Sequence, residues 1–379
     1  MKFAFCLTTY FPYGGLQRDF LRMAVAATAR GHQIEAYTTD WRGEIPAGLK
    51  VNVLPTRGWT NHARTCSLAA SLTEQVKKNA FDAVVGFNKM PGLDLYFAAD
   101  PCFAQRVSQK SAWYRLTGRC RTYLRMEAAV FGIESRTRIL SISEPQAVLY
   151  RRHYGTPRDR FFPLPPGVAP DRALGADRHA VRRRRRKELS IRGNEQMVLL
   201  VGSNYRLKGV DRAIRAMASL PRTLRDHTTL VIAGRGRSGP FIRLARKNKV
   251  EQRVRFLGER DDVPELLAAA DLLLHPAYEE NTGTVLIEAL AAELPVLVTE
   301  VCGYSAYIRE AAAGEIVPSP FRQQVLDRLL AAMLSSPDRD RWRRNARRYV
   351  ARTDIFALSE TAVDFIEQVA RWLSCPNHG

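Results

Sequence analysis

Short apolar segments, each followed by a turn and a stretch of helical length, repeat along most of the sequence. In the first repeat, an apolar strand at Lys2–Leu7 precedes a Gly-Gly turn and a helix at Gln17–Arg30, which Gly31 ends. No hairpin turn joins successive strands, and strands that alternate with helices pair in parallel through right-handed crossovers. The sequence therefore predicts an α/β protein built from doubly wound parallel sheets.

The repeat stops once, at residues 161–168, and then resumes. This stretch contains three prolines and one glycine, which is typical of a linker between domains. We predict a Rossmann-like first domain over residues 1–166 and a Rossmann-like second domain over 167–352, a division that suits a chain of 379 residues. Ligands of such sheets bind at the carboxyl ends of the strands, so the cleft between the domains is the expected site.

The predicted strands are four to six residues long and mostly apolar. Those of the first domain are Lys2–Leu7, Ile34–Thr38, Val51–Leu54, Ala83–Phe87 and Ile139–Ile142. Those of the second domain are Val198–Gly202, Thr229–Ala233, Val254–Leu257, Leu272–His275 and Val296–Thr299.

The net charge of +20 is concentrated in three segments. Residues 101–126 hold six basic residues and no acidic one, residues 178–192 hold eight basic and one acidic, and residues 338–352 hold seven arginines and two aspartates. The remainder is close to neutral, which excludes a uniformly basic, histone-like protein. A nucleic-acid-binding protein stays as a distant alternative, although no RNP, KH, helix-turn-helix or zinc-finger pattern is present.

The sequence predicts a cytoplasmic protein. Its first residues are typical of a buried strand rather than of a signal peptide, since no small-residue cleavage site follows them. No apolar run approaches the roughly 18 residues that span a bilayer. The six cysteines are scattered without a C-x-x-C pair, so we expect free thiols in a reducing compartment.

The first candidate site is the glycine pair Gly14-Gly15, between the first strand and the first helix. Paired glycines let backbone N–H groups approach an anion at a helix N-terminus. The loop is neither G-x-G-x-x-G nor a P-loop, and no acidic residue is placed for a cofactor ribose, so a nicotinamide-dependent oxidoreductase is excluded. A plain tight turn remains the alternative.

Two cations, Arg206 and Lys208, lie in the loop that follows the first strand of the second domain. Fixed cations at the carboxyl edge of a sheet suit a diphosphate, whose charge grows as it leaves. A solvated basic loop is the alternative interpretation.

Two carboxylates, Glu280 and Glu288, flank the start of a helix that Gly283 and Thr284 should open. Glu280 then lies in the loop before the helix, where it can accept hydrogen bonds from a sugar. Glu288 lies about one turn inside the helix, where it can accept a pair of hydrogen bonds from a ribose.

Two further patterns favour structural interpretations. His275 ends an apolar strand, and a buried core histidine is favoured over a general base. Asp338 and Asp340 match the D-x-D spacing of metal-bound nucleotide sugars, but they lie in an arginine-rich helix far from any strand end. We interpret this match as chance and predict no metal site.

Taken together, seven segments resemble the retaining family 4 glycosyltransferases of the GT-B fold, and most closely their subgroup of lipopolysaccharide core glucosyltransferases. The resemblance covers essentially the whole chain. It is carried by Tyr10–Phe20, Gly86–Asp94, Ala98–Asp100, Leu164–Gly167, Lys208–Arg212, Leu274–Tyr278 and Val301–Tyr304. It implies two Rossmann-like domains facing across a cleft, and a last helix, in residues 353–379, that crosses back to the first domain.

The resemblance also implies site residues. Those on the donor side would be Gly14, Gly15, Arg206, Lys208, Arg260, Glu280, Asn281, Thr282, Gly283 and Glu288. Those on the acceptor side would be Asn88, Lys89 and Asp100. The catalytic residues would be Lys208, Glu280, Asp19 and Asp100.

This sequence departs from the family at one donor position. The family has Arg-Lys directly before the glycine of the loop, whereas this chain has Leu207-Lys208 with Arg206 one position early. Either Arg206 reaches the phosphate through a shifted backbone, or Lys208 acts largely alone.

The activity that the resemblance implies is retaining transfer of a hexose, glucose or alternatively an N-acetylhexosamine, from a UDP-sugar to an inner-core heptose of lipopolysaccharide. The acceptor hydroxyl would attack on the same face as the departing UDP, and the protein would contribute positioning and charge stabilisation. The resemblance implies no metal and no cofactor, since the UDP-sugar is a co-substrate.

A membrane-contacting segment is predicted between Trp113 and Arg125, which has helical spacing. Trp113, Leu116, Cys120, Tyr123 and Leu124 would share one face, and Arg115, Arg119, Arg121 and Arg125 the other. Aromatic residues beside arginines are typical of a helix in a membrane interface, and the resemblance places peripheral contact with the anionic inner face of the bacterial inner membrane here. A core-packed helix with a solvated basic face is the alternative.

The arginine run at Arg182–Lys187 has two interpretations. In the first, its cations bind phosphates of the acceptor or of lipid head groups. In the second, the run is a solvated linker helix.

Overall fold

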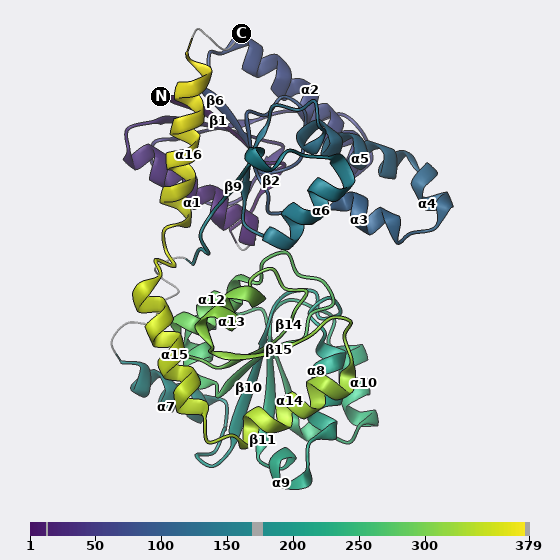
Figure 1. The fold of residues 1–379 in the computed structure, drawn as a ribbon, viewed down its shortest axis with the longest axis vertical. Helices are drawn as coiled ribbons and strands as arrows, with labels where there is room; N and C mark the ends of the chain where they lie inside the picture. Colours follow the sequence, from purple (N-terminus) through teal and green to yellow (C-terminus); the bar gives the residue numbers. More distant parts are fainter. Residues whose placement is uncertain (13, 169–176, 376–379) are drawn as a thin grey trace. The chain divides into compact units, whose positions relative to one another are not determined.

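The computed structural model describes residues 1–12, 14–168 and 177–375, with the backbone alone at Lys77. Tyr13, which precedes the predicted glycine pair, lies outside the described residues. The chain divides into two compact units (Figure 1). Unit 1 comprises Met1–Pro165 with Ala357–Gly379, and unit 2 comprises Pro166–Phe356.

Unit 1 is built on a seven-stranded sheet in which every neighbouring pair is parallel. β1 lies inside the sheet, with Phe3 opposite Ile34 on one side and Ala83 on the other. In spatial order the strands are β5 (Leu49–Val53), β3 (Gln33–Thr38), β1 (Lys2–Cys6), β6 (Ala83–Gly86), β7 (Leu95–Phe97), β8 (Arg138–Ser141) and β9 (Phe161–Pro163). A separate parallel pair joins β2 (Thr9–Tyr10) to β4 (Asp40–Trp41).

The five strands predicted for unit 1 are confirmed. The two-residue strands β2 and β4 were missed, and so were two strands of the seven-stranded sheet. β7 has only three residues, all buried, which is too short to stand out in the sequence. β9 lies in the stretch that we predicted as linker, at the edge of the sheet beside β8. An edge strand tolerates Pro163 because proline lacks the N–H that an interior strand must donate.

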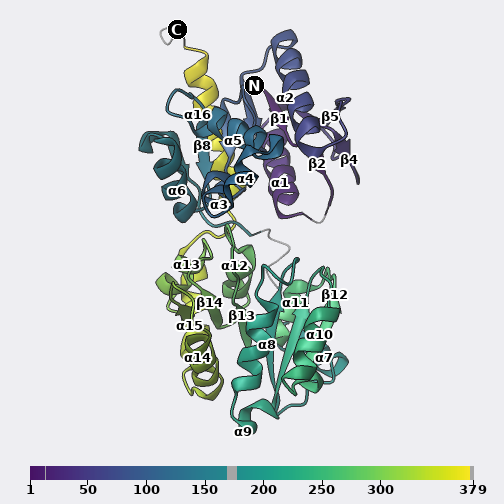
Figure 2. The ribbon, with the colours of Figure 1, turned by 90° about the vertical axis from the view of Figure 1, so that its right-hand side faces the viewer.

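Helices cover both faces of the unit 1 sheet (Figures 1 and 2). Phe3 and Phe5 of β1 pack into a core with α1 and α16, whereas Ala4 and Cys6 pack on the opposite face with α2, α5 and α6. This alternation follows from the two-residue period of a strand. The helices are α1 (Gly15–Ala29), α2 (Asn61–Lys78), α3 (Phe103–Ser108), α4 (Ala112–Leu116), α5 (Gly118–Phe131), α6 (Glu144–Tyr154) and α16 (Leu358–Leu373).

Unit 2 has a six-stranded parallel sheet. Its spatial order is β12 (Val254–Gly258), β11 (Thr228–Ala233), β10 (Gln196–Val201), β13 (Leu272–His275), β14 (Val296–Thr299) and β15 (Gly314–Val317). The five predicted strands are confirmed, and β15 was missed. Met197 and Leu199 of β10 face one core, and Val198 and Leu200 face the other.

The helices of unit 2 form a layer on each face of its sheet (Figure 2). One layer packs with Met197 and includes α11, α12, α13 and α15, and the other packs with Val198 and includes α8, α10 and α14. The bounds are α7 (Arg178–Glu188), α8 (Val210–Ser219), α9 (Arg222–Arg225), α10 (Gly239–Lys247), α11 (Val263–Ala269), α12 (Thr284–Ala291), α13 (Ser305–Ala311), α14 (Gln323–Ser335) and α15 (Arg339–Arg352).

The last helix returns to unit 1, as Figure 1 shows. α16 packs against α1, where Arg30 forms ion pairs with Glu360 at 2.6 Å and with Asp364 at 2.5 Å. Phe365 of α16 also contacts Phe162 of β9, with ring centroids 4.7 Å apart.

Two helical predictions need correction. The segment from Trp113 to Arg125 is not one helix, because it breaks at Thr117, whose hydroxyl caps α5 by accepting from the Cys120 N–H at 3.2 Å. The arginine run is not a solvated linker helix either. It lies in α7, which packs on α11, with Arg184 and Arg185 both paired with Glu265.

Candidate active site

The loop after β10 brings Lys208 to the carboxyl edge of the unit 2 sheet. A Cβ atom at Gly202 would lie 2.8 Å from Cε of Lys208, so glycine there lets the lysine side chain lie across the end of the strand. Gly209, at φ 71°, begins α8, and a Cβ there would lie 2.1 Å from the carbonyl oxygen of Pro276. A side chain at Gly202 would therefore collide with Lys208, and one at Gly209 would collide with the backbone of Pro276, so both positions require glycine.

Lys208 forms an ion pair with Oε2 of Glu280. His275, the last residue of β13, places Nε2 3.2 Å from the same oxygen and is 1% exposed. Burial alone would raise the pKa of the Glu280 carboxyl, but the His275 hydrogen bond and the Lys208 charge outweigh it and hold the pKa at about 2. Glu280 is therefore a permanent carboxylate, so His275 donates and Glu280 accepts.

His275 is buried, as the core-histidine interpretation expects, and its Nε2 is hydrogen-bonded to a carboxylate rather than packed only among apolar side chains. Its other nitrogen, Nδ1, is buried and has no hydrogen-bond partner among the described residues.

Backbone contacts hold the loop that carries Glu280. Glu280 forms an isolated parallel bridge with Cys302, and the Tyr304 N–H donates to the carbonyl of Thr282 at 2.8 Å. Gly283, at φ 83°, is the residue that starts α12, as the sequence predicts. Glu288 lies buried in the second turn of that helix.

Arg212, at the start of α8, is hydrogen-bonded to the segment that leads from β13 to Glu280. The sequence analysis missed this role. The Arg212 guanidinium donates to the carbonyls of Pro276 at 3.1 Å and Ala277 at 2.9 Å. The same group lies between the rings of Tyr278 and Phe321, 3.5 and 3.6 Å from their centroids. The only local signal was an arginine in the apolar face of a helix, which does not reveal carbonyls 64 residues away.

The other two predicted donor cations differ in their surroundings. Arg260 is paired with Asp262 through Nε at 2.8 Å and Nη2 at 2.5 Å, which raises the pKa of the guanidinium. Arg206 is exposed, and its side chain makes no hydrogen bond or ion pair with any residue in the described ranges. Leu207, in the family's arginine position, accepts at its carbonyl from the Tyr278 N–H at 2.8 Å.

In unit 1, Gly14 and Gly15 open α1 as predicted. Gly14 is the N-cap, no side chain caps it, and the first turn contains no acidic residue. Asp19 lies one turn further and pairs with Arg22. Burial raises the pKa of the Asp19 carboxyl more than Arg22 lowers it.

The predicted acceptor residues lie at the carboxyl edge of the unit 1 sheet. Asn88 follows β6, and its Oδ1 accepts from the Thr8 N–H, beyond β1, at 2.8 Å. Asp100 follows β7, and burial raises the pKa of its carboxyl, opposed by Lys89. Because β6 and β7 are neighbouring parallel strands, these two residues lie beyond the same edge of the sheet.

Lys89 has its partners inside the protein. Its ammonium pairs with Glu127, which is fully buried in α5, and donates to the carbonyl of Pro101 at 2.9 Å. Glu127 also accepts from the N–H groups of Phe103 and Ala104, both at 2.8 Å, and so anchors the start of α3. The sequence analysis missed Glu127, because one acid in an apolar helical stretch carries no local signal.

The predicted membrane segment protrudes from unit 1 in Figure 1. Trp113 of α4 is 81% exposed and Leu116 is also exposed, whereas Cys120 of α5 is buried. The guanidinium carbon of Arg119 lies 5.8 Å from the centroid of the Tyr123 ring. Arg115 and Arg125 are both exposed. Arg115 donates to the Ser108 carbonyl, and Arg125 donates to the sulfur of Cys66. No helix in the described ranges is long and apolar enough to cross a membrane.

The structure also shows the surroundings of the cysteines and of the D-x-D match. All six cysteines are free, which confirms the predicted thiols. Asp338, of the D-x-D match, precedes α15 and pairs with Arg341 at 3.1 Å. In the described part of the chain, no group of three or more His, Cys, Asp or Glu is arranged to hold a metal ion.

Comparison with known proteins shows the family to which the chain belongs. The family model for group 1 glycosyl transferases matches residues 181–349. The lipopolysaccharide glucosyltransferase WaaG of Escherichia coli (strain K12) is 45% identical over 368 residues, which cover 97% of this chain and 98% of that protein. The chain belongs to this family of glycosyltransferases.

Solved structures agree with the fold of the transferase. A crystal structure of WaaG, described as a glycosyltransferase involved in lipopolysaccharide biosynthesis, has a TM-score of 0.90 at 44% identity and covers 96% of this chain and 99% of that chain. Anabaena HepE, solved with UDP and glucose, has a TM-score of 0.76 at 17% identity, covers 97% and 100% of the two chains, and shows the fold alone. The predicted family and the GT-B fold of two Rossmann-like domains are confirmed.

Proposed function

We propose that the transferase moves glucose from UDP-glucose to an inner-core heptose of lipopolysaccharide, with retention of anomeric configuration. The observation that carries the proposal is the near-full-length identity to a lipopolysaccharide glucosyltransferase. The paired Lys208 and Glu280 at the carboxyl edge of the unit 2 sheet support it, because a diphosphate and a sugar require an adjacent cation and carboxylate.

Each edge residue then has a chemical role. The Lys208 ammonium stabilises the charge that develops on the leaving UDP. Glu280 accepts hydrogen bonds from hydroxyls of the transferred sugar, and the low pKa of its carboxyl makes it a poor base for the proton of the acceptor hydroxyl. In this proposal that proton is transferred to a phosphate oxygen of the leaving UDP, and the reaction proceeds without a metal.

Unit 1 supplies the remaining groups in this proposal. The uncapped N–H groups at Gly14 and Gly15 face anionic phosphate, which a helix N-terminus attracts. Asp19, Asn88 and Asp100 bind hydroxyls of the sugar and of the acceptor. On the donor side of unit 2, Glu288 binds the uridine ribose.

We further propose that α4 docks on the anionic inner face of the bacterial inner membrane. Trp113 and Leu116 expose apolar surface, and exposed basic residues, among them Arg115 and Arg119, flank them. An apolar tip within a cationic surround suits insertion beside anionic head groups. The transferase would then meet its glycolipid acceptor as a peripheral protein.

A donor panel tests the activity. The purified transferase is incubated with a truncated inner-core acceptor and UDP-glucose, UDP-galactose or UDP-N-acetylglucosamine, and the product is analysed by mass spectrometry and NMR. A glucosylated product with an α-anomeric signal, formed equally in EDTA, is expected. Preferred transfer of N-acetylglucosamine, an inverted anomer or loss of activity in EDTA would each overturn that part of the proposal.

A binding measurement tests the nucleic-acid alternative. A ligand that binds the folded state raises its unfolding temperature. We expect UDP to raise the unfolding temperature and an oligonucleotide of matched charge to leave it unchanged in physiological salt.

A further inference from the structure

Unit 2 contains a second polar site, a pocket of about 490 Å³ at the opposite end of β13 from His275. Two helices line it with arginines spaced four residues apart. Arg178 and Arg182 come from α7, and Arg343 and Arg347 come from α15. Because that spacing is close to one helical turn, each pair projects from one face of its helix. We call this site, with Arg344 at its rim, the arginine pocket.

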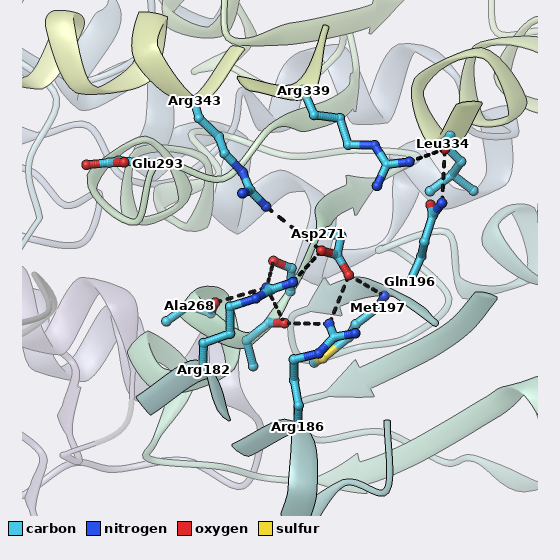
Figure 3. A network of polar contacts seen from close by, with 12 residues as sticks. Arg182, Arg186, Gln196, Met197, Ala268, Asp271, Glu293, Leu334, Arg339 and Arg343 are labelled. Carbon is cyan, nitrogen blue, oxygen red and sulfur yellow. Dashed lines mark hydrogen bonds and ion pairs between the residues drawn. The ribbon is translucent and has the colours of Figure 1, made fainter. Parts of the chain in front are cut away.

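Two of the lining arginines, Arg182 and Arg343, contact a buried carboxylate, Asp271, which we call the floor of the pocket (Figure 3). Asp271 binds Arg182 at 2.6 Å and Arg186 at 2.9 Å, and it accepts from the Met197 N–H at 2.8 Å. Arg343 approaches the same carboxylate at 3.8 Å. Three guanidiniums therefore surround one carboxylate. Burial raises the pKa of Asp271, but Arg182, the Met197 N–H and Arg186 outweigh it and keep that pKa below its ordinary value.

A second carboxylate lies in the wall and is also shared. Glu293 binds Arg178 at 3.0 Å and binds Arg347 through both of its oxygens, at 2.7 and 2.9 Å. Arg344, which is exposed, makes no hydrogen bond or ion pair with the residues that the structure describes. The third acid, Asp340, is exposed at the rim.

Positive charge is in excess at this site. Counting the floor and the lining, six arginines face the carboxylates of Asp271, Glu293 and Asp340, an excess of three positive charges. The environment of Arg178 shows the effect. Burial lowers the pKa of Arg178, Glu293 opposes this, and the charges of Arg343, Arg182 and Arg347 add to the lowering.

We propose that the arginine pocket binds a phosphomonoester or pyrophosphate group. Guanidinium groups pair with tetrahedral phosphate oxygens through two N–H donors at once, and a phosphate dianion offsets the excess charge better than a monovalent anion does. The pocket is wide enough for such a group. Its source is either a soluble phosphate ester or a lipid-borne phosphate head group, and the two share this chemistry.

The pocket is independent of the proposed donor site. Asp271 precedes β13 and His275 ends it, so the two sites lie at opposite edges of the same sheet. Pyrophosphate binding at the pocket therefore requires no contribution from Lys208. Failure of one proposal leaves the other intact.

The test uses calorimetric titration of the full chain with inorganic pyrophosphate. The double variant R343Q/R344Q removes two pocket cations, and R341Q/R348Q removes two charges from exposed positions of the same helix outside the pocket. We expect the first to weaken binding by about tenfold or more, because charge-assisted hydrogen bonds are lost, and the second to change it little.

Three outcomes would overturn the inference. Equal weakening in both double variants would mean that binding reflects the general charge of α15. Loss of all pyrophosphate binding in Lys208→Ala would assign it to the other edge of the sheet. Unchanged pyrophosphate binding in R343Q/R344Q would mean that the arginine pocket is not the binding site. If that variant unfolds, the single variants Arg344→Glu and Arg348→Glu give the same comparison at exposed positions.

Vesicles identify the source of the phosphate. Phosphatidylcholine vesicles with and without phosphatidic acid are sedimented with wild type and both double variants. A selective loss of phosphatidic acid binding in R343Q/R344Q supports a lipid-borne phosphate. Selective loss of pyrophosphate binding alone supports a soluble ester, and no selective loss in either measurement contradicts the inference.

Discussion

His275 donates a hydrogen bond to Glu280, with 3.2 Å between Nε2 and Oε2, from the buried end of β13 to the loop before α12. Lys208 contacts the same oxygen from a third segment. One carboxylate oxygen thus links three segments at the carboxyl edge of the unit 2 sheet: the end of β13, the loop after β10 and the loop before α12. The position of Glu280, and with it that of the sugar in the proposed reaction, therefore depends on a histidine that is itself almost fully buried.

Replacing His275 tests this positioning role. His275→Phe should lower kcat/KM for the donor about 10–100-fold, because a displaced Glu280 no longer holds the sugar. His275→Gln keeps an N–H donor near the position of Nε2 and should recover most of the loss. Affinity for UDP, which has no sugar, should stay near wild type in both. A parallel loss of UDP affinity would instead indicate that the whole edge had collapsed.

Removing the Lys208 charge should slow turnover far more than it weakens folding. Lys208→Ala is expected to lower kcat about 100–1000-fold, by analogy with the loss of one oxyanion-stabilising donor. Arg206→Ala is the matched comparison, and a loss of about tenfold or less is expected because an exposed charge is screened by solvent. A larger loss in Arg206→Ala would mean that Arg206 replaces the family's arginine.

The low pKa of Glu280 makes stability pH-dependent in a defined window. Above its ordinary pKa of 4.5 the carboxyl is ionised in both folded and unfolded states, so the stabilisation is fully present. As pH falls from 4.5 towards 2, the unfolded chain binds the proton first and the stabilisation is lost. At pH 3.5 the loss is on the order of 1 kcal/mol. Urea denaturation of wild type and Glu280→Gln at pH 6 and 3.5 measures it, since the glutamine variant should lack this component.

The exposed tip of α4 should control membrane binding. The double variant W113A/L116A is expected to weaken binding to anionic vesicles about tenfold, because burying such side chains contributes roughly 1.5–3 kcal/mol each in full burial. Trp59→Ala is the control, since Trp59 is 102% exposed elsewhere in unit 1. Binding should also weaken as salt rises. Equal effects of the two variants would argue against α4 as the contact.

Glu127 should be essential for the stability of unit 1. Glu127→Ala leaves Lys89 without its carboxylate and two N–H groups of α3 without an acceptor, so we expect the free energy of unfolding to fall by about 3–5 kcal/mol. Glu74→Ala removes an exposed carboxylate from a helical pair with Lys78 and should change stability little. Urea denaturation of both variants gives the comparison.

Local pattern was enough to predict the architecture. Strand and helix periods, the glycine pair at 14–15 and the turn at Gly283 depend on neighbours in sequence, and the structure has each of them where predicted. The misses were of a different kind. β7 has only three residues, β15 begins Gly-Glu and has one buried residue so that it shows no apolar run, and Pro163 concealed an edge strand.

The sequence by itself determined two α/β units, the edges at which their strands end, and the residue types at those edges. Tertiary structure decided which charges are neutralised, because the partners are far apart along the chain. Lys208 and Glu280 are 72 residues apart, and Arg182 and Asp271 are 89 apart. Most arginines of residues 178–192 have acidic partners on other elements, while the arginines that α7 and α15 together present to one pocket outnumber the carboxylates there. A charge count along the chain cannot distinguish these cases, since pairing depends on distance in space.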